Sequence, residues 1–221
     1  MGHHHDDFEG EEPVRGLPAL LPPGEEMVWQ GQPSPWQMAV HVMHVRKVAL
    51  WFLLVAAWRW LEAAQAGGTV AEVVAAAAMA VAWGVASISV LGLLAWATAR
   101  SAIYTITTAR VVMRFGIAIP VTFNVPLKQV IGADIERLGG KAGSIMLATA
   151  EHARLSWAVL WPHARPWKLA QPQPALRCLA DVAPAQDALA RQLRRVHGTS
   201  GSVAQEPVRV PALPDAEPVS A

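Results

Sequence analysis

The longest apolar segment of the chain runs from residue 73 to residue 99. Its twenty-seven residues include no charged side chain, and about 20 apolar residues suffice to cross the roughly 30 Å hydrocarbon core of a bilayer. The pattern predicts a transmembrane helix over about 72–99. Small residues such as Gly84 and Ser87 let a second helix approach closely. We expect them to receive a helix of a partner subunit; the alternative is a single contact within the chain.

A second apolar stretch precedes this helix. Eleven uncharged residues, 48–58, are followed by Arg59, which has a tryptophan on either side. Tryptophan favours the membrane interface, and a long arginine side chain can extend to the headgroups, so we predict a second span over about 43–61. The connecting segment 62–72 contains a Gly-Gly pair, which predicts a helical hairpin.

Basic residues flank the open side of this hairpin. Arg46 and Lys47 precede the first helix and Arg100 follows the second, whereas the connecting segment has no Lys or Arg beyond Arg59 at its edge. The positive-inside rule then places both termini in the cytoplasm of an inner-membrane, multi-pass protein. Residues 1–35 carry seven acidic residues against one Arg and no apolar core, so we expect a mostly flexible leader rather than a cleaved signal peptide.

Beyond residue 100 the pattern changes to the alternation of β-strands. Turn residues separate six expected strands, which cover residues 103–107, 111–115, 117–125, 130–135, 144–150 and 154–161. Residues 184–196 have Pro at the start and Arg near the end, as helices do. Residues 198–221 lack periodicity, which predicts a disordered tail.

The expected fold is therefore a membrane protein of the α+β class. A membrane region over 36–99, with a transmembrane hairpin, is followed by a cytoplasmic β domain over 100–197 that ends in a helix. Whether the segment 36–45 forms a third membrane element, interfacial rather than crossing, is left open.

Composition supports this interpretation and adds a charge asymmetry. The chain is 53% hydrophobic and 16% charged, which is unusual for a soluble domain. Residues 100–197 contain thirteen Lys/Arg against five Asp/Glu, so this part should be attracted to anionic phospholipids. The candidate lipid-binding residues are Arg100, Arg110 and Arg114. The lone Cys178 excludes an intramolecular disulfide and is expected to be a buried, reduced thiol.

The segment WPHARPW, residues 161–167, concentrates residues that are common at binding hot spots. Its candidate partner-binding residues are Trp161, His163, Arg165 and Trp167. The alternative is that the tryptophans attach the last strand to the core. A metal site at His163 is not expected, because no second ligand lies at a suitable spacing.

The chain resembles a bacterial pleckstrin-homology (PH)-like membrane domain. The resemblance lies in two membrane helices followed by the motifs YTIT (104–107), RFG (114–116) and VPLKQVIGADI (125–135). The segments 110–135 and 160–178 together resemble the PuhB family of photosynthetic complex assembly proteins of purple bacteria. That resemblance implies a non-enzymatic scaffold that binds reaction-centre and light-harvesting complex 1 subunits during maturation. The family is often described with three spans, whereas this chain has two clear ones.

In such a setting His41 and His44, which lie one helical turn apart before the first span, could bind the magnesium of bacteriochlorophyll. Solvated interfacial histidines are the more common case, and no other cofactor is expected. A pigment carrier and a lipid-binding, membrane-organising protein remain alternative functions.

Catalysis is not expected, because the sequence has no HExxH, CxxC, nucleophile elbow or glycine-rich phosphate loop. No nucleic-acid partner is expected either, and homo-oligomerisation is left open.

Overall fold

The computed structural model describes residues 16–17, 20–117, 119–149, 161–163 and 173–198. The N-terminal and helical elements in chain order are β1 (Met27–Gly31), α1 (Pro35–Gln37), a π-helical turn η1 (Met38–Val42), α2 (Val45–Gln65) and α3 (Val70–Ser101). The remaining elements are β2 (Ile103–Thr107), β3 (Arg110–Phe115), β4 (Val121–Pro126), η2 (Leu127–Gln129), β5 (Val130–Gly139), β6 (Ala142–Thr149), β7 (Ala175–Leu179) and α5 (Ala183–His197).

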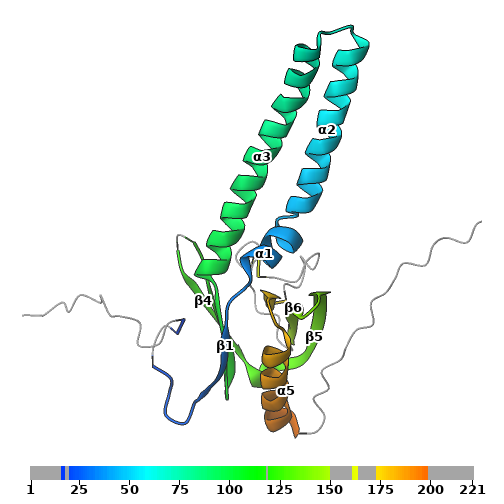
Figure 1. The fold of residues 1–221 in the computed structure, drawn as a ribbon. Helices are drawn as coiled ribbons and strands as arrows, with labels where there is room; N and C mark the ends of the chain where they lie inside the picture. Colours follow the sequence, from blue (N-terminus) through cyan, green and yellow to red (C-terminus); the bar gives the residue numbers. More distant parts are fainter. Residues whose placement is uncertain (1–15, 18–19, 118, 150–160, 164–172, 199–221) are drawn as a thin grey trace, which may run out of the picture.

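The strands form two antiparallel sheets with the orders β1-β2-β3-β4 and β5-β6-β7. One apolar core joins the two sheets and the C-terminal helix α5. Its central side chains include Tyr104, Ile106, Leu147, Leu176 and Leu189, each no more than 1% exposed. The arginines of α5 are exposed while its apolar side chains belong to this core, so the helix is amphipathic. It lies at the end of the β domain away from the hairpin (Figure 1).

The β domain is discontinuous in sequence. Strand β1 pairs antiparallel with β2, which lies more than seventy residues later, with Gly31 opposite Tyr104 and Gln30 opposite Thr105. The helical hairpin is thus inserted between the first two strands of the sheet. The sequence predicts a mostly flexible segment over residues 1–35 and a domain that begins at residue 100, whereas the first strand of the domain lies before the hairpin.

The helices α2 and α3 lie side by side and project from one end of the β domain (Figure 1). The N-terminus of α3 is capped by Thr69, whose hydroxyl and backbone amide exchange hydrogen bonds with the backbone and carboxylate of Glu72. Between the helices, Gly84 of α3 faces Phe52 of α2 so closely that a Cβ at residue 84 would lie 2.8 Å from the Phe52 Cβ. This close approach of the two helices therefore requires a residue without a side chain at position 84.

The segment before α2 is bent rather than continuous with it. The short helices over Pro35–Val42 meet Val45–Gln65 at an angle of 56°, and His44 at the bend has φ +54°. Met38 and Ala39 pack with Ala95 and Ala99 of α3 and with Cys178 of β7. This cluster, the junction, connects the hairpin to the β domain, and the segment 36–45 does not form a third separate crossing helix.

By length and composition, α3 could cross a membrane, and the bent pair Pro35–Val42 plus Val45–Gln65 would pass the same test if taken as one span. Only 17% of the most apolar window of α3 is buried within the molecule. A core helix of a soluble protein would be mostly covered, so this surface needs lipid or another protein around it.

The strands expected over 103–107, 111–115, 130–135 and 144–150 correspond to β2, β3, β5 and β6, with small shifts at their ends. The expected strand 117–125 was too long, because β4 begins only at Val121. The sequence pattern does not predict β1 and β7. The expected strand 154–161 falls almost wholly outside the described residues. The expected helix 184–196 corresponds to α5.

Candidate functional site

Exposed apolar side chains cover the outer faces of the hairpin. They include Trp51, Leu54 and Trp58 on α2 and Trp83 and Leu93 on α3, each more than half exposed. Between the two helices lies an open groove of about 400 Å³, lined by Val55, Arg59, Ala76, Met79 and Trp83 among others. In water such a surface would be a strong aggregation site.

Basic residues surround the end of the hairpin that meets the β domain. Arg46 and Lys47 are exposed in the first turn of α2, and Arg100 is exposed in the last turn of α3. Arg114 lies on β3, opposite Ile103, just beyond the end of α3. We call these four residues the basic rim. Arg100 and Arg114, expected from sequence to contact lipid, thus lie where an apolar surface changes to a polar one.

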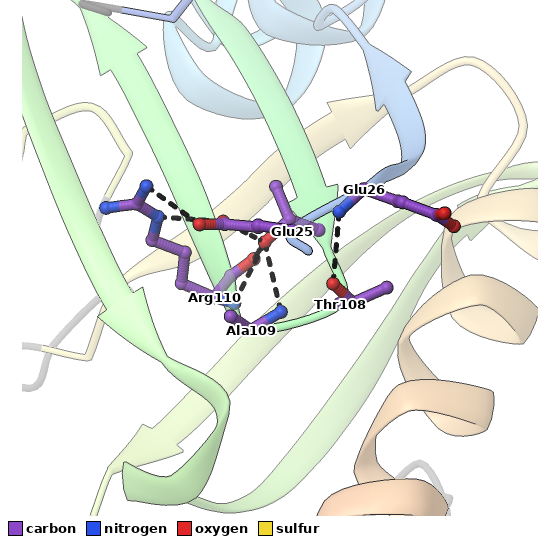
Figure 2. Close-up of polar contacts among 6 residues, drawn as sticks. Glu25, Glu26, Thr108, Ala109 and Arg110 are labelled. Atoms are coloured by element: carbon purple, nitrogen blue, oxygen red, sulfur yellow. Dashed lines mark hydrogen bonds and ion pairs between the residues drawn. The ribbon is translucent and has the colours of Figure 1, made fainter. Parts of the chain in front are cut away.

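Arg110, the third expected lipid-binding residue, lies elsewhere. It begins β3 at the far end of the sheet, and its guanidinium donates from Nε and Nη2 to the two carboxylate oxygens of Glu25, at 2.9 and 3.0 Å (Figure 2). The Glu25 side chain is only 8% exposed. The expectation of lipid contact at Arg110 is therefore corrected: this residue attaches the segment before β1 to the sheet.

The same turn is organised by threonine hydroxyls. The Thr107 hydroxyl accepts hydrogen bonds from the amides of Ala109 and Arg110 and lies 2.6 Å from a Glu25 carboxylate oxygen. Thr108 accepts the amide of Glu26 (Figure 2). An anionic headgroup would have to displace Glu25 to reach this turn, so the role of the turn is structural.

A buried polar cluster lies inside the domain near the hairpin. The Tyr104 hydroxyl is 2.5 Å from Nδ1 of His163, and it also accepts the backbone amide of Arg177 at 3.3 Å. The His163 ring packs on Phe115, with ring centroids 4.7 Å apart. A hydroxyl that donates to Nδ1 and accepts from the amide satisfies all of these groups.

Burial dominates the electrostatics of this cluster. Desolvation, with a smaller contribution from the nearby Arg177 cation, lowers the pKa of His163 to about 3. Burial also raises the pKa of the Tyr104 hydroxyl and brings the pKa of the Cys178 thiol to about 11. All three groups are therefore neutral near pH 7, and they are too deeply buried to reach a substrate.

The structure divides the expected docking segment 161–167. His163 is 1% exposed and belongs to the core, which corrects its assignment as a partner-binding residue. Trp161 is 49% exposed and remains a candidate contact. Arg165 and Trp167 fall outside the described residues. Sequence reasoning missed Tyr104 as the hydrogen-bond partner of His163, and Arg177, whose amide donates to the Tyr104 hydroxyl. Tyr104 is the single tyrosine of the chain, and this was the only available signal.

The two small residues expected to receive a partner helix also differ in position. Gly84 is buried against Phe52 within the hairpin, so the alternative of a contact inside the chain is the correct one for this residue. Ser87 is half-buried, and its hydroxyl donates to the Trp83 carbonyl one turn earlier.

His41 and His44, the expected pigment ligands, lie at the bend before α2. His41 is half-buried in the π-helical turn, whereas His44 is exposed with a left-handed backbone. The break between the two residues means that they do not share one regular helical face.

Cys178 is buried and free, as expected. It belongs to the junction and has a left-handed backbone with φ +57°. Its amide donates a hydrogen bond to the Ser144 hydroxyl, and its carbonyl accepts one from the Ser34 amide. It is therefore a packing residue.

Comparison with known proteins agrees with this architecture. Residues 37–193 match the family model described as "Bacterial PH domain". The chain is also similar to an "Uncharacterized 23.7 kDa protein in puhA 5'region" of Rhodobacter capsulatus, at 43% identity over 188 residues, or 82% of this chain and 84% of the relative. No solved structure gives a significant match. Two antiparallel sheets closed by a C-terminal helix, together with the family match over most of the chain, show that the chain belongs to the bacterial PH domain family.

Proposed function

We propose that this protein is a membrane-bound assembly factor for the photosynthetic reaction centre and light-harvesting complex 1, and that it acts as a non-catalytic scaffold. The observation that carries the proposal is the Rhodobacter capsulatus relative, which is named for its position beside puhA, a reaction-centre gene. The resemblance of residues 110–135 and 160–178 to the PuhB family leads to the same proposal.

The hairpin supplies the membrane part of this function. α2 and α3 contain 21 and 32 residues, or about 31 and 48 Å at 1.5 Å per residue, enough to cross roughly 30 Å of hydrocarbon. Because the two helices are antiparallel, both ends of the hairpin emerge on one side of the membrane. The basic rim favours the cytoplasm as that side, and the β domain would then lie beneath the inner membrane.

The outer faces of the hairpin supply the binding surface. Gly84 is used within the hairpin, so a subunit helix would contact the outward-facing apolar residues and the groove beside Trp83. Trp161 on the β domain would contact a cytoplasmic segment of the same subunit. These contacts would shield unfinished subunit surfaces until the complex closes.

Purification of a tagged chain from membranes of photosynthetically grown cells tests the proposal. Reaction-centre and light-harvesting 1 polypeptides should copurify, and Trp83→Ala together with Trp161→Ala should reduce their yield. Leu20→Ala, at a residue 71% exposed on the leader, is the matched control. Copurification of phospholipid alone would contradict the scaffold function.

The alternative function is lipid binding without a photosynthetic partner, and the basic rim favours it. Such a protein should be recovered with anionic lipid but without antenna or reaction-centre subunits. Its deletion should also leave the yield of assembled photosynthetic complex unchanged, whereas the scaffold proposal requires a loss.

A further inference from the structure

The connection between β3 and β4 has an apolar tip. Ile117 is 59% exposed and Ile119 is 77% exposed, and Val121 at the start of β4 is 37% exposed. Single exposed aliphatic residues are common on protein surfaces, but three within five residues make this connection unusually apolar. We call residues Ile117, Ile119 and Val121 the β3–β4 tip.

The sheet register places this tip beside the hairpin. β2 begins two residues after α3 ends, and its first residue, Ile103, pairs with Arg114. β3 therefore runs back toward α3, and residues beyond Arg114 extend past the level at which the chain leaves the helix. The next three residues, 115–117, can extend up to about 10 Å beyond Arg114 at 3.3 Å per residue. In Figure 1 the start of β4 accordingly lies beside the lower end of α3.

A tight turn holds the tip in this position. Gly116 has φ +129°, and a Cβ at this residue would lie 2.0 Å from the Ile119 carbonyl oxygen. Only glycine permits so close an approach of the two backbone segments. Pro120 follows directly and restricts the backbone at the start of β4. The close approach of Gly116 to Ile119 thus fixes the two ends of the connection that carries the isoleucines.

The charges around the tip match an anionic membrane surface. The basic rim, Arg46, Lys47, Arg100 and Arg114, occupies the same end of the domain. Apolar side chains next to basic ones are the combination that binds the interface of a membrane with anionic lipids. The exposed Trp36, 68% exposed on α1, adds a residue type that favours this layer.

We propose that the β3–β4 tip inserts Ile117 and Ile119 into the interfacial layer of the leaflet from which the hairpin emerges, with anionic phospholipid as its ligand. This inference rests on the membrane location in the proposed function. The tip would be a third attachment point beside the ends of α2 and α3, and it would fix the orientation of the β domain relative to the bilayer.

A polarity-sensitive fluorophore on the full-length chain tests this. Ile119→Cys can be labelled selectively because Cys178 is buried. The matched control is Ile131→Cys: Ile131 is 67% exposed and lies at the far end of the domain, just after η2, whose Leu127 amide bonds to the Ala109 carbonyl. The labelled chains are reconstituted in phosphatidylethanolamine–phosphatidylglycerol vesicles with or without a lipid that carries a quencher near its headgroup.

The label at residue 119 should show a blue-shifted emission and should be quenched by the lipid-borne quencher, while the label at residue 131 should show neither effect. Equal, water-like emission from both labels on a chain that floats with the vesicles would overturn the tip proposal and leave the membrane-bound scaffold standing. A chain that does not float with the vesicles would overturn both. A label at 119 that is shielded in native membranes but not in protein-free vesicles would assign the tip to a protein partner and overturn the lipid proposal.

Discussion

At the scale of single residues, the Glu25–Arg110 pair attaches the first strand to the rest of the domain. The Glu25 side chain is 8% exposed and bonds to both Arg110 and Thr107. Arg110→Ala would leave this carboxylate buried without its cation, at a cost of about 2 kcal/mol in the free energy of unfolding. Thermal unfolding of the chain in detergent micelles would measure the loss.

Glu26→Ala is the control for this prediction, because Glu26 is adjacent but exposed. It should change the free energy of unfolding by less than about 0.5 kcal/mol. A double-mutant cycle of Glu25→Ala with Arg110→Ala then isolates the pair. Additive effects in that cycle would mean that the two side chains do not stabilise each other.

His163 makes the stability of the domain depend on pH. Its pKa is about 3 in the folded protein because of burial, whereas the pKa of a histidine in an unfolded chain is about 6.5. As the pH falls below about 6.5, the unfolded chain binds a proton that the folded chain does not, so stability is lost. Between about pH 7.5 and pH 5 the loss should be roughly 2 kcal/mol.

The variant His163→Gln removes the titrating group, so its stability should fall less over the same pH range, whatever its absolute stability. The difference between the two pH profiles is the relevant measurement, since other groups contribute to both. Parallel profiles would show that His163 is solvated or protonated in the folded protein.

At the scale of elements, replacement of either of two glycines of α3 by alanine should change the stability of the hairpin in opposite directions. A Cβ at Gly84 would lie 2.8 Å from Phe52, whereas a Cβ at Gly92 would have nothing within 4 Å in the described structure. Gly84→Ala should therefore separate α2 from α3 and cost about 1–3 kcal/mol. Gly92→Ala should gain up to about 1 kcal/mol from helix propensity. Melting temperatures of the two variants in the same detergent give the comparison.

Equal melting temperatures for Gly84→Ala and the unmodified chain would contradict the observed helix contact. Gly84→Leu provides a stronger form of the test, because its larger side chain cannot be accommodated by a small movement of the Phe52 ring. Gly92→Leu is its matched control.

Elements formed by local interactions could be predicted from the sequence. The apolar run before Arg100, the Gly-Gly turn of the hairpin and the arginine-rich end of α5 each indicate their structure within a few residues. β1 could not be predicted in this way, because its five residues lie among Pro, Gly and Glu, and the partner that stabilises it, β2, is distant in sequence. β7 lies after a proline-rich stretch and was missed for the same reason.

The positions of the candidate site residues could likewise be predicted only where they depend on residues nearby in sequence. The positions of Arg100 and Arg114 on the hairpin side of the domain followed from their short distance in sequence to the end of α3. The positions of Arg110, His163 and Gly84 depended on Glu25, Tyr104 and Phe52, which are distant in sequence. Charge and residue type could not distinguish an exposed binding residue from one that is paired inside the fold.

At the scale of the whole molecule, the hairpin is an insertion in a β domain, and this predicts which truncations fold. Gly31 of β1 lies opposite Tyr104 of β2, so deletion of residues 35–101 leaves a connection within the usual length of β-hairpin loops, 2–5 residues. The residues that remain between the end of β1 and the start of β2 are Gln32, Pro33, Ser34 and Ala102. This shortened chain should fold as a β domain and stay in the supernatant when membranes are sedimented.

A chain that begins at residue 100 is the informative comparison, because it has the same strands apart from β1. It lacks the Glu25–Arg110 pair and exposes the edge of β2, whose free amide and carbonyl groups can pair with other chains. We expect it to aggregate, while the hairpin deletion gives a β-rich circular dichroism spectrum and a cooperative thermal transition. If the chain from residue 100 folds equally well, β1 is dispensable, and the domain boundary lies after the hairpin rather than before it.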